Sequence, residues 1–319
     1  MKNAIKTAAI ASSIAASAPA FAQVDITAAG PEGDLAGTMI APEDGRPVVL
    51  MIPGSGPTDR DGNNPLGVAS ASYRLLAEAL ATDGIGSVRI DKRGMFGSAG
   101  ASADANDVTI GAYAEDVHSW VTATRAATGV ECVWVLGHSE GGLVALKAAQ
   151  EPGDICGLIL VASMGRKAGD IMREQLSGNP VNAPILEEAL AAIDTLENGG
   201  TVDAANMHPA LAGLFAPQVQ GFLADMMAHD PAELAAATDL PMLIVSGTKD
   251  IQTPVTDGNT LSAARSDALH VVIEDMNHAL KLVAEDTRAA NLAAYARPDL
   301  PVAQELVTAV AAFVTGDED

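Results

Sequence analysis

Short, uninterrupted apolar runs alternate with helical segments along most of this chain, and this rhythm constrains the fold more than any other feature. The runs 47–52, 132–136 and 156–162 are not broken by a polar residue at every second position. Such runs are typical of strands buried on both faces of a sheet. Because helical periodicity follows the runs, as over 70–82, the sequence predicts βαβ units. We therefore expect an α/β fold with a mostly parallel central sheet flanked by helices.

The same patterns predict the remaining elements. Strands are expected at 24–29, 35–40, 86–91, 241–246 and 269–274, and helices at 108–127, 140–150, 257–266 and 301–314. The rhythm stops between 164 and 238, where no strand is convincing and Ala, Leu, Glu and Met predominate. Helical segments there are expected near 185–197, 217–229 and 231–237. We read this stretch as a helical cap, 164–238, inserted into a core formed by 23–163 plus 239–319.

The first 22 residues have the three parts of a secretory signal in order. Lys2 and Lys6 form a positive region, residues 7–19 are small and apolar, and Ala20-Phe21-Ala22 fits the small-x-small cleavage rule. We expect a signal peptide over 1–22, a chain that starts at Gln23, and a periplasmic or secreted bacterial protein. No other stretch has the length and hydrophobicity of a membrane span.

The charge and cysteine content narrow the function further. Eighteen Lys and Arg oppose 41 Asp and Glu, for a net charge of −23. So acidic a surface repels nucleic acid and favours an uncharged small-molecule substrate. The two cysteines, Cys132 and Cys156, match no zinc pattern, and no other cluster has metal-ligand spacing, so we expect no metal or cofactor. They begin strands expected to be neighbours and in register, which permits either a disulfide or two buried thiols.

Residues 137–141, Gly-His-Ser-Glu-Gly, fit the G-x-S-x-G pattern once in the chain. They follow the predicted strand 132–136 and open the predicted helix 140–150. On such a strand-to-helix turn the serine is held in a strained conformation with its hydroxyl projecting above the sheet. We therefore predict that Ser139 is a nucleophile.

A serine hydroxyl needs a general base, and in a triad on this kind of turn the chain order is Ser, acid, His. His278 lies in the loop after the last predicted strand and is our candidate base. Asp250, in the loop after strand 241–246, is the candidate acid that orients the imidazole. Asp275 is a rival acid, but it stands only three residues before His278.

Acyl transfer also needs N–H donors for the oxyanion. The backbone N–H of Glu140, directly after the nucleophile, should be one. The loop Pro53-Gly54-Ser55-Gly56 follows strand 47–52, and the N–H of Ser55 is our choice for the second. A phosphate-binding loop is the competing interpretation, but the Lys-Ser/Thr of a P-loop is missing.

These motifs together resemble a bacterial α/β-hydrolase of the serine esterase type. The resemblance rests on IPGSGPTDRDGN (52–63), DKRG (91–94), LGHSEGG (136–142), SGTKDIQTP (246–254) and MNHALK (276–281). It implies an α/β-hydrolase fold and the catalytic roles of Ser139, Asp250 and His278. The chain departs from better-known esterases in carrying Pro53-Gly54 where they often carry His-Gly.

The resemblance also places a cap where residues 164–238 interrupt the chain, and a cap sets the substrate. Its apolar residues are candidates for substrate contact: Leu211, Leu214, Phe215, Phe222, Met226 and Met227. Because aromatic residues are scarce, we expect a small to medium aliphatic pocket and uncharged esters of short to medium acyl chain. A peptidase, amidase or thioesterase with the same triad is the alternative, and export argues against coenzyme A thioesters. The sequence says nothing of the oligomeric state.

Overall fold

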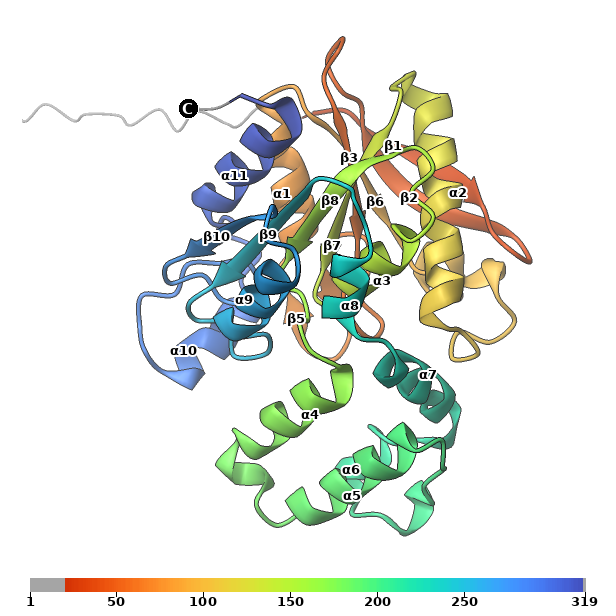
Figure 1. Ribbon diagram of the computed structural model, residues 1–319, viewed down its shortest axis with the longest axis vertical. Coiled ribbons are helices and arrows are strands. Elements are labelled where there is room, and N and C mark those ends of the chain that lie inside the picture. Colours follow the sequence, from red (N-terminus) through yellow and green to blue (C-terminus); the bar gives the residue numbers. More distant parts are fainter. Residues whose placement is uncertain (1–20, 318–319) are drawn as a thin grey trace, which may run out of the picture.

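The computed structural model describes residues 21–317, which form one central sheet covered by helices on both faces (Figure 1). Eight strands lie in the order β1-β2-β6-β3-β7-β8-β9-β10. The pairs β1–β2 and β2–β6 are antiparallel, and all later pairs are parallel. The predicted fold class, a mostly parallel sheet flanked by helices, is confirmed. The predicted signal peptide lies almost entirely outside the described residues.

The elements begin and end close to where the sequence patterns place them. The strands are β1 (Gln23–Ala29), β2 (Asp34–Ile40), β3 (Val48–Ile52), β4 (Asn63–Asn64), β5 (Val68–Ala69), β6 (Gly86–Ile90), β7 (Val133–His138), β8 (Ile155–Val161), β9 (Met242–Gly247) and β10 (Leu269–Ile273). The α-helices are α1 (Ser72–Ala81), α2 (Ile110–Thr128), α3 (Glu140–Ala148), α4 (Ala168–Ser177), α5 (Leu186–Glu197), α6 (Pro209–Ala212), α7 (Pro217–Ala228), α8 (Pro231–Ala236), α9 (Val255–Ala264), α10 (Arg288–Ala293) and α11 (Gln304–Thr315). Helices α4, α6 and α10 were not predicted, and few of their side chains are buried.

Burial on both faces explains the uninterrupted apolar strands. On β3, Leu50 and Ile52 pack into a core with α2 and α3, whereas Val49 and Met51 pack into a second core with α1 and α11. Every residue of β3, β6 and β9 is buried. Side chains on a strand alternate between faces, so a strand between two cores has no position left for a polar side chain that faces water.

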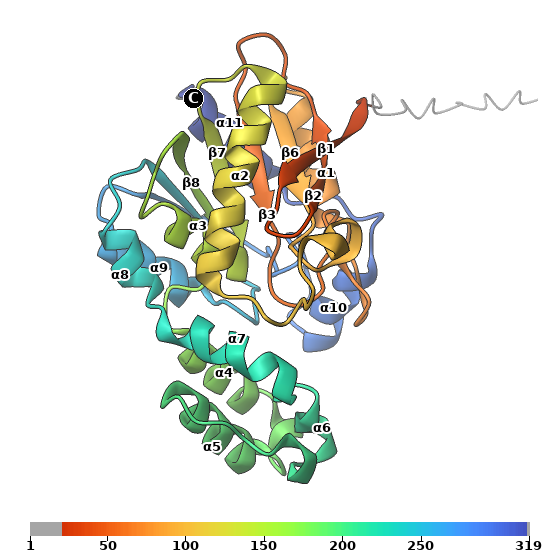
Figure 2. The same cartoon turned by 90° about the vertical axis from the view of Figure 1, so that its right-hand side faces the viewer.

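The segment between β8 and β9 contains helices α4 to α8 and no strand among its residues, all of which are described. Figures 1 and 2 show α4, α5, α6 and α7 as a lobe that lies below the sheet in both views. Because α4 follows the end of β8, this lobe lies at the carboxyl ends of the parallel strands. Across the described residues, none of the helices has both the length and the hydropathy needed to cross a bilayer.

Cys132 and Cys156 form a disulfide, with their Cα atoms 5.2 Å apart. The expectation that Cys132 and Cys156 occupy in-register positions is wrong. Val133 pairs with Ile155 but Trp134 pairs with Gly157, so Cys156 is an extra residue in β8. A regular ladder that continued the Trp134–Gly157 register would pair Cys132 with Ile155 and Cys156 with Val133. The two cysteines are therefore bonded without being ladder partners, and Cys156 lies at the bulge.

The disulfide should therefore be detectable in the purified protein and should stabilise it. A cross-link across 24 residues contributes about 3 kcal/mol, chiefly by restricting the unfolded chain. We expect no reactive thiol in the denatured, unreduced protein and two after reduction. The Cys132→Ala/Cys156→Ala variant should unfold at correspondingly lower denaturant concentration. Two reactive thiols before reduction would contradict the bond.

Candidate active site

Ser139 occupies the tight turn between β7 and α3. Its backbone has φ +55° and ψ −121°, a conformation that residues with a side chain rarely adopt and that costs about 1–3 kcal/mol. The turn is held because the Ser139 N–H donates to the Val161 carbonyl at 3.1 Å and the Ser139 carbonyl accepts from Gly142 at 3.0 Å. The strain is thus compensated by the sheet on one side and the helix on the other.

The glycines of the motif let the turn pack against its surroundings. A Cβ on Gly137 would overlap the carbonyl of Gly141, and a Cβ on Gly141 would overlap the carbonyl of Ile52. A Cβ on Gly54 would lie 3.2 Å from that of Ser139. The loop after β3 therefore runs directly beside the serine.

His278 and Asp250 meet as the sequence predicts for a base and its orienting acid. His278 Nδ1 lies 2.8 Å from Asp250 Oδ2, and both side chains are buried. The other oxygen, Asp250 Oδ1, accepts from the backbone N–H groups of Gln252 and Thr253 at 2.8 and 2.9 Å. The Thr253 hydroxyl lies 2.9 Å from Asp250 Oδ2. The carboxylate is therefore fixed on both sides.

The electrostatics keep Asp250 ionised. Burial by itself raises the pKa of Asp250, but the charge and hydrogen bond of His278 and the two backbone donors outweigh it, so the net pKa is lowered. An ionised carboxylate only accepts, so the Nδ1–H of His278 donates to Asp250, and in the neutral form of this ring the lone pair lies on Nε2. Within residues 21–317 no hydrogen bond joins the Ser139 hydroxyl to His278. Such bonds commonly tighten only when substrate binds.

Asp275, the rival candidate for the acid, forms an ion pair with Lys249 instead, at 2.8 Å. Its carboxylate is half exposed. His270, on β10, bonds the Ser246 hydroxyl at 3.0 Å. Of the two candidate acids, Asp250 and not Asp275 is therefore the one that bonds His278.

The two predicted oxyanion donors come from loops on adjacent parallel strands. Ser55 follows β3 and is exposed, and its N–H has no acceptor in the described chain. Glu140 is the first residue of α3, so its N–H has no acceptor within the helix. Strands β3 and β7 are neighbours, and their carboxyl ends form the switch point of the sheet, where ligands of open α/β folds bind. Both amides are therefore available to a ligand.

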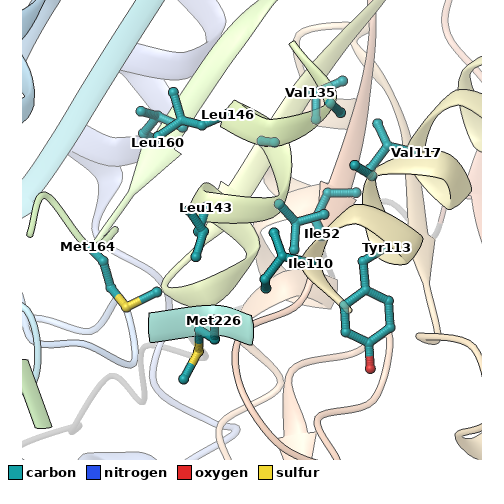
Figure 3. Packing of buried hydrophobic residues seen from close by; sticks show 14 of the residues in the cluster. Ile52, Ile110, Tyr113, Val117, Val135, Leu143, Leu146, Leu160, Met164 and Met226 are labelled. Atoms are coloured by element: carbon teal, nitrogen blue, oxygen red, sulfur yellow. The ribbon is translucent and has the colours of Figure 1, made fainter. Parts of the chain in front are cut away.

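The predicted substrate-contact residues of the cap differ in exposure. Phe215 is fully buried and Leu211, Met226 and Met227 are nearly so, whereas Leu214 is 40% exposed. The Phe222 ring is half buried and meets Tyr113 of α2 edge-on at 5.9 Å. Figure 3 shows Met226 of α7 in one cluster with Leu143 of α3, Met164, and Ile110 and Tyr113 of α2. Helix α7 thus belongs to the same apolar cluster as α2 and as α3, the helix that begins directly after Ser139.

A surface hollow of about 510 Å³ lies far from this chemistry. It is lined by residues 42–47, 128–132 and 314–315 together with Cys156. These residues lie at the amino ends of β3, β7 and β8, whereas Ser139 follows the carboxyl end of β7. Among the described residues no three His, Cys, Asp or Glu side chains are grouped to hold a metal ion.

Sequence reasoning missed the roles of two buried polar residues of the site. Tyr73 of α1 bonds both Gly54 and His138, and Lys92 bonds both Gly54 and Glu140. Tyr73 looked like one apolar position of an amphipathic helix. Lys92 belongs to the DKRG segment directly after β6. A charged residue at the end of a buried strand was the signal that could have identified it.

The chain matches the sequence profile of the serine aminopeptidase family, S33 hydrolases, over residues 66–285. This chain belongs to the S33 hydrolase family. The profile spans the Ser139 turn, Asp250 and His278, although it begins after the loop that carries Ser55.

Known relatives agree with the S33 assignment. The chain is 27% identical to esterase EstD of Thermotoga maritima over 267 residues, which are 81% of this chain and 60% of that protein. It therefore spans less than two thirds of that relative. The solved Pyrococcus furiosus esterase Pf2001 superposes with a TM-score of 0.60 at 15% identity, covering 93% of this chain and 91% of that one. A thermophilic esterase of Thermogutta terrifontis gives 0.55 at 20%, covering 92% and 98%. These structures establish the α/β-hydrolase fold of this S33 hydrolase.

The neutrality of His138 makes stability depend on pH. Burial, then the charge of His278, lowers the pKa of His138 from 6.5 to about 3. The unfolded chain therefore binds a proton below pH 6.5 that the folded chain does not, so stability falls as pH falls. From pH 7.5 to 5 this group should remove about 2 kcal/mol of unfolding free energy. Denaturant titrations of wild type and His138→Gln should differ by that amount, and equal pH slopes would contradict it.

Proposed function

We propose that this protein hydrolyses carboxylic esters of short to medium acyl chain through an acyl-enzyme on Ser139. The observation that carries the proposal is the buried His278–Asp250 pair, joined at 2.8 Å, in the same site as a strained serine turn. A base held in the Nδ1–H tautomer beside a projecting serine hydroxyl is the arrangement that activates a serine nucleophile.

In the first half of the proposed reaction, His278 Nε2 removes the Ser139 proton as Oγ attacks the ester carbonyl. The carbonyl oxygen becomes an oxyanion and accepts hydrogen bonds from the N–H groups of Ser55 and Glu140. The imidazolium, stabilised by Asp250, gives its proton to the departing alcohol. In the second half, water loses a proton to His278 and attacks the acyl group, and Ser139 regains its proton as the acid leaves.

The family's printed name supports an aminopeptidase as the second candidate, with the same triad. An aminopeptidase binds the substrate's terminal ammonium with a free carboxylate. The buried carboxylates of this site are already paired, Asp250 with His278 and Glu140 with Lys92. This pairing favours the ester. A panel of p-nitrophenyl esters of increasing acyl length, run beside aminoacyl anilides, separates the two activities.

We also propose that the enzyme acts in the periplasm or outside the cell. The signal-like residues 1–22 support this, and so does the Cys132–Cys156 disulfide, because such bonds persist in oxidising compartments. The net charge of −23 favours an uncharged small-molecule ester over an anionic substrate or nucleic acid.

Replacing Ser139 by Ala should abolish ester turnover while leaving the fold intact, because loss of the nucleophile typically costs several orders of magnitude in rate. Wild type should bind a fluorophosphonate probe covalently at Ser139, and the variant should not. Circular dichroism and the unfolding midpoint serve as the control for folding. A folded Ser139→Ala variant that keeps wild-type turnover would exclude this serine as the nucleophile.

The cap should set acyl-chain preference through Phe222, whose ring is half buried against Tyr113. Phe222→Ala should change the ratio of kcat/KM between a butyrate and an octanoate ester several-fold, because a few methylenes in an apolar pocket are each worth about 0.8 kcal/mol. Val181→Ala is the matched control, since Val181 is a cap residue that is 81% exposed. An unchanged ratio in a folded Phe222→Ala enzyme would remove Phe222 from the specificity determinants.

A further inference from the structure

The peptide groups of Gly54 are held from two sides by buried side chains. Its N–H donates to the Tyr73 hydroxyl at 3.1 Å, and its carbonyl accepts from Lys92 Nζ at 2.8 Å. Tyr73 and Lys92 are each only 4% exposed. Gly54 directly precedes Ser55, whose N–H is the proposed oxyanion donor. A loop that would otherwise be free at this point is therefore fixed by two separate elements, α1 and the turn after β6.

Lys92 is itself anchored to the residue after the nucleophile. Its ammonium lies 3.1 Å from Glu140 Oε1, and the side chains of this ion pair are 3% and 1% exposed. The ammonium also lies 5.3 Å from the centre of the Tyr113 ring. Glu140 Oε2 has no hydrogen-bond partner among the described residues. A buried ion pair with an unsatisfied oxygen is a poor device for stability alone, since an apolar pair of similar size often serves as well.

The geometry of the peptide bond links Lys92 to the oxyanion. The Gly54 carbonyl and the Ser55 N–H belong to one planar trans peptide, so they point in opposite directions. Because Lys92 Nζ bonds the Gly54 carbonyl, it also fixes the direction in which the Ser55 N–H points. The same bond polarises the peptide group and so strengthens the Ser55 N–H as a donor. The second donor, the N–H of Glu140, belongs to the residue whose carboxylate holds the same cation.

We propose that Lys92 is a positioning residue that couples the two halves of the oxyanion hole, by bonding the Gly54 carbonyl and the Glu140 carboxylate at once. This inference rests on the proposed function of the Ser139 site. Lys92 does not touch substrate. It fixes the direction of the Ser55 N–H relative to α3, and so relative to the Glu140 N–H.

Tyr73 supports the other side of Gly54 through a chain of neutral groups. Its O–H donates to His138 Nδ1 at 2.8 Å, and His138 Nε2–H donates to the His278 carbonyl at 2.9 Å. The lowered pKa of His138 keeps the ring neutral, which fixes these donor and acceptor roles. The oxyanion loop, the nucleophile turn and the loop of the general base are thus joined by consecutive hydrogen bonds.

The test separates positioning from stability by removing both charges together. Lys92→Met alone leaves the Glu140 charge buried without a partner and should destabilise the protein. The double variant Lys92→Met/Glu140→Leu leaves no unpaired charge and keeps the backbone N–H at position 140. The Gly54 carbonyl, however, loses its hydrogen bond from Lys92. Lys281→Met is the matched control, because Lys281 is a buried lysine whose Nζ bonds the Leu300 carbonyl instead.

Three quantities are measured on the folded double variant: kcat for an ester, the inhibition constant of a transition-state analogue, and the rate of fluorophosphonate labelling. Rates are normalised to the number of active sites. We expect kcat for an ester to fall about 10- to 100-fold, as for the weakening of one oxyanion donor, with KM within about twofold. The inhibition constant of a trifluoromethyl ketone, whose adduct carries the oxyanion, should rise by the same factor as kcat falls. The rate of fluorophosphonate labelling should fall in parallel. Lys281→Met should leave all three at the wild-type values.

Unchanged kcat, ketone affinity and labelling rate in the folded double variant would overturn the role of Lys92. The role of Lys92 would also be overturned if fewer molecules of the double variant reacted with the fluorophosphonate while kcat, ketone affinity and labelling rate per active site were unchanged. That result would show that the ion pair serves only to keep the protein folded. Failure of the ester hypothesis is distinguishable from both. If wild type reacts with the fluorophosphonate but turns over no ester, the substrate class is wrong, while the labelling rates of wild type and double variant still test Lys92.

Discussion

The close approach of β3, β7 and the start of α3 is the constraint on which the site depends. Ser139 can take its strained conformation only because the Gly137 and Gly141 positions leave room for carbonyl groups where a Cβ would otherwise lie. Bonds to Val161 and Gly142 hold the turn in place. The same closeness brings Gly54 against Ser139, so the serine and the loop that faces it are parts of one packed unit.

Buried polar groups then determine how this unit works, because each charge in it must have a partner. Asp250 is ionised and is matched by His278 and two backbone N–H groups. His138, next to Ser139 in the chain, has a pKa lowered by burial and contributes hydrogen bonds as a neutral ring. Lys92 and Glu140 are charged but face one another. His278 Nε2, by contrast, has no hydrogen-bond partner within residues 21–317, as the proposed proton transfer requires.

The helical segment 164–238 is bound to this framework by apolar packing and by several polar contacts, among them the Arg166–Asp257 ion pair. Leu223, Met226 and Met227 of α7 belong to the same core cluster as α2 and α3. The Asp225 carboxylate accepts from the Ile110 N–H at 2.7 Å, at the start of α2, where a helix attracts negative charge. Helix α7 and the helix that follows the Ser139 turn are therefore parts of one apolar cluster.

The sequence by itself determined the sheet, the nucleophile turn and the candidate triad, because these depend on local patterns. Two-sided burial demands uninterrupted apolar strands, and a tight turn demands glycine around Ser139. Asp250 and His278 follow strands whose carboxyl ends meet at one edge. Only the tertiary structure decided the contacts between distant segments. The bulge at Cys156 depends on how β7 and β8 pair, and the bonds of Tyr73 and Lys92 to Gly54 join residues 19 and 38 positions apart. No periodicity records such contacts, because a buried tyrosine or lysine finds its partner only when the separate helices and strands have packed.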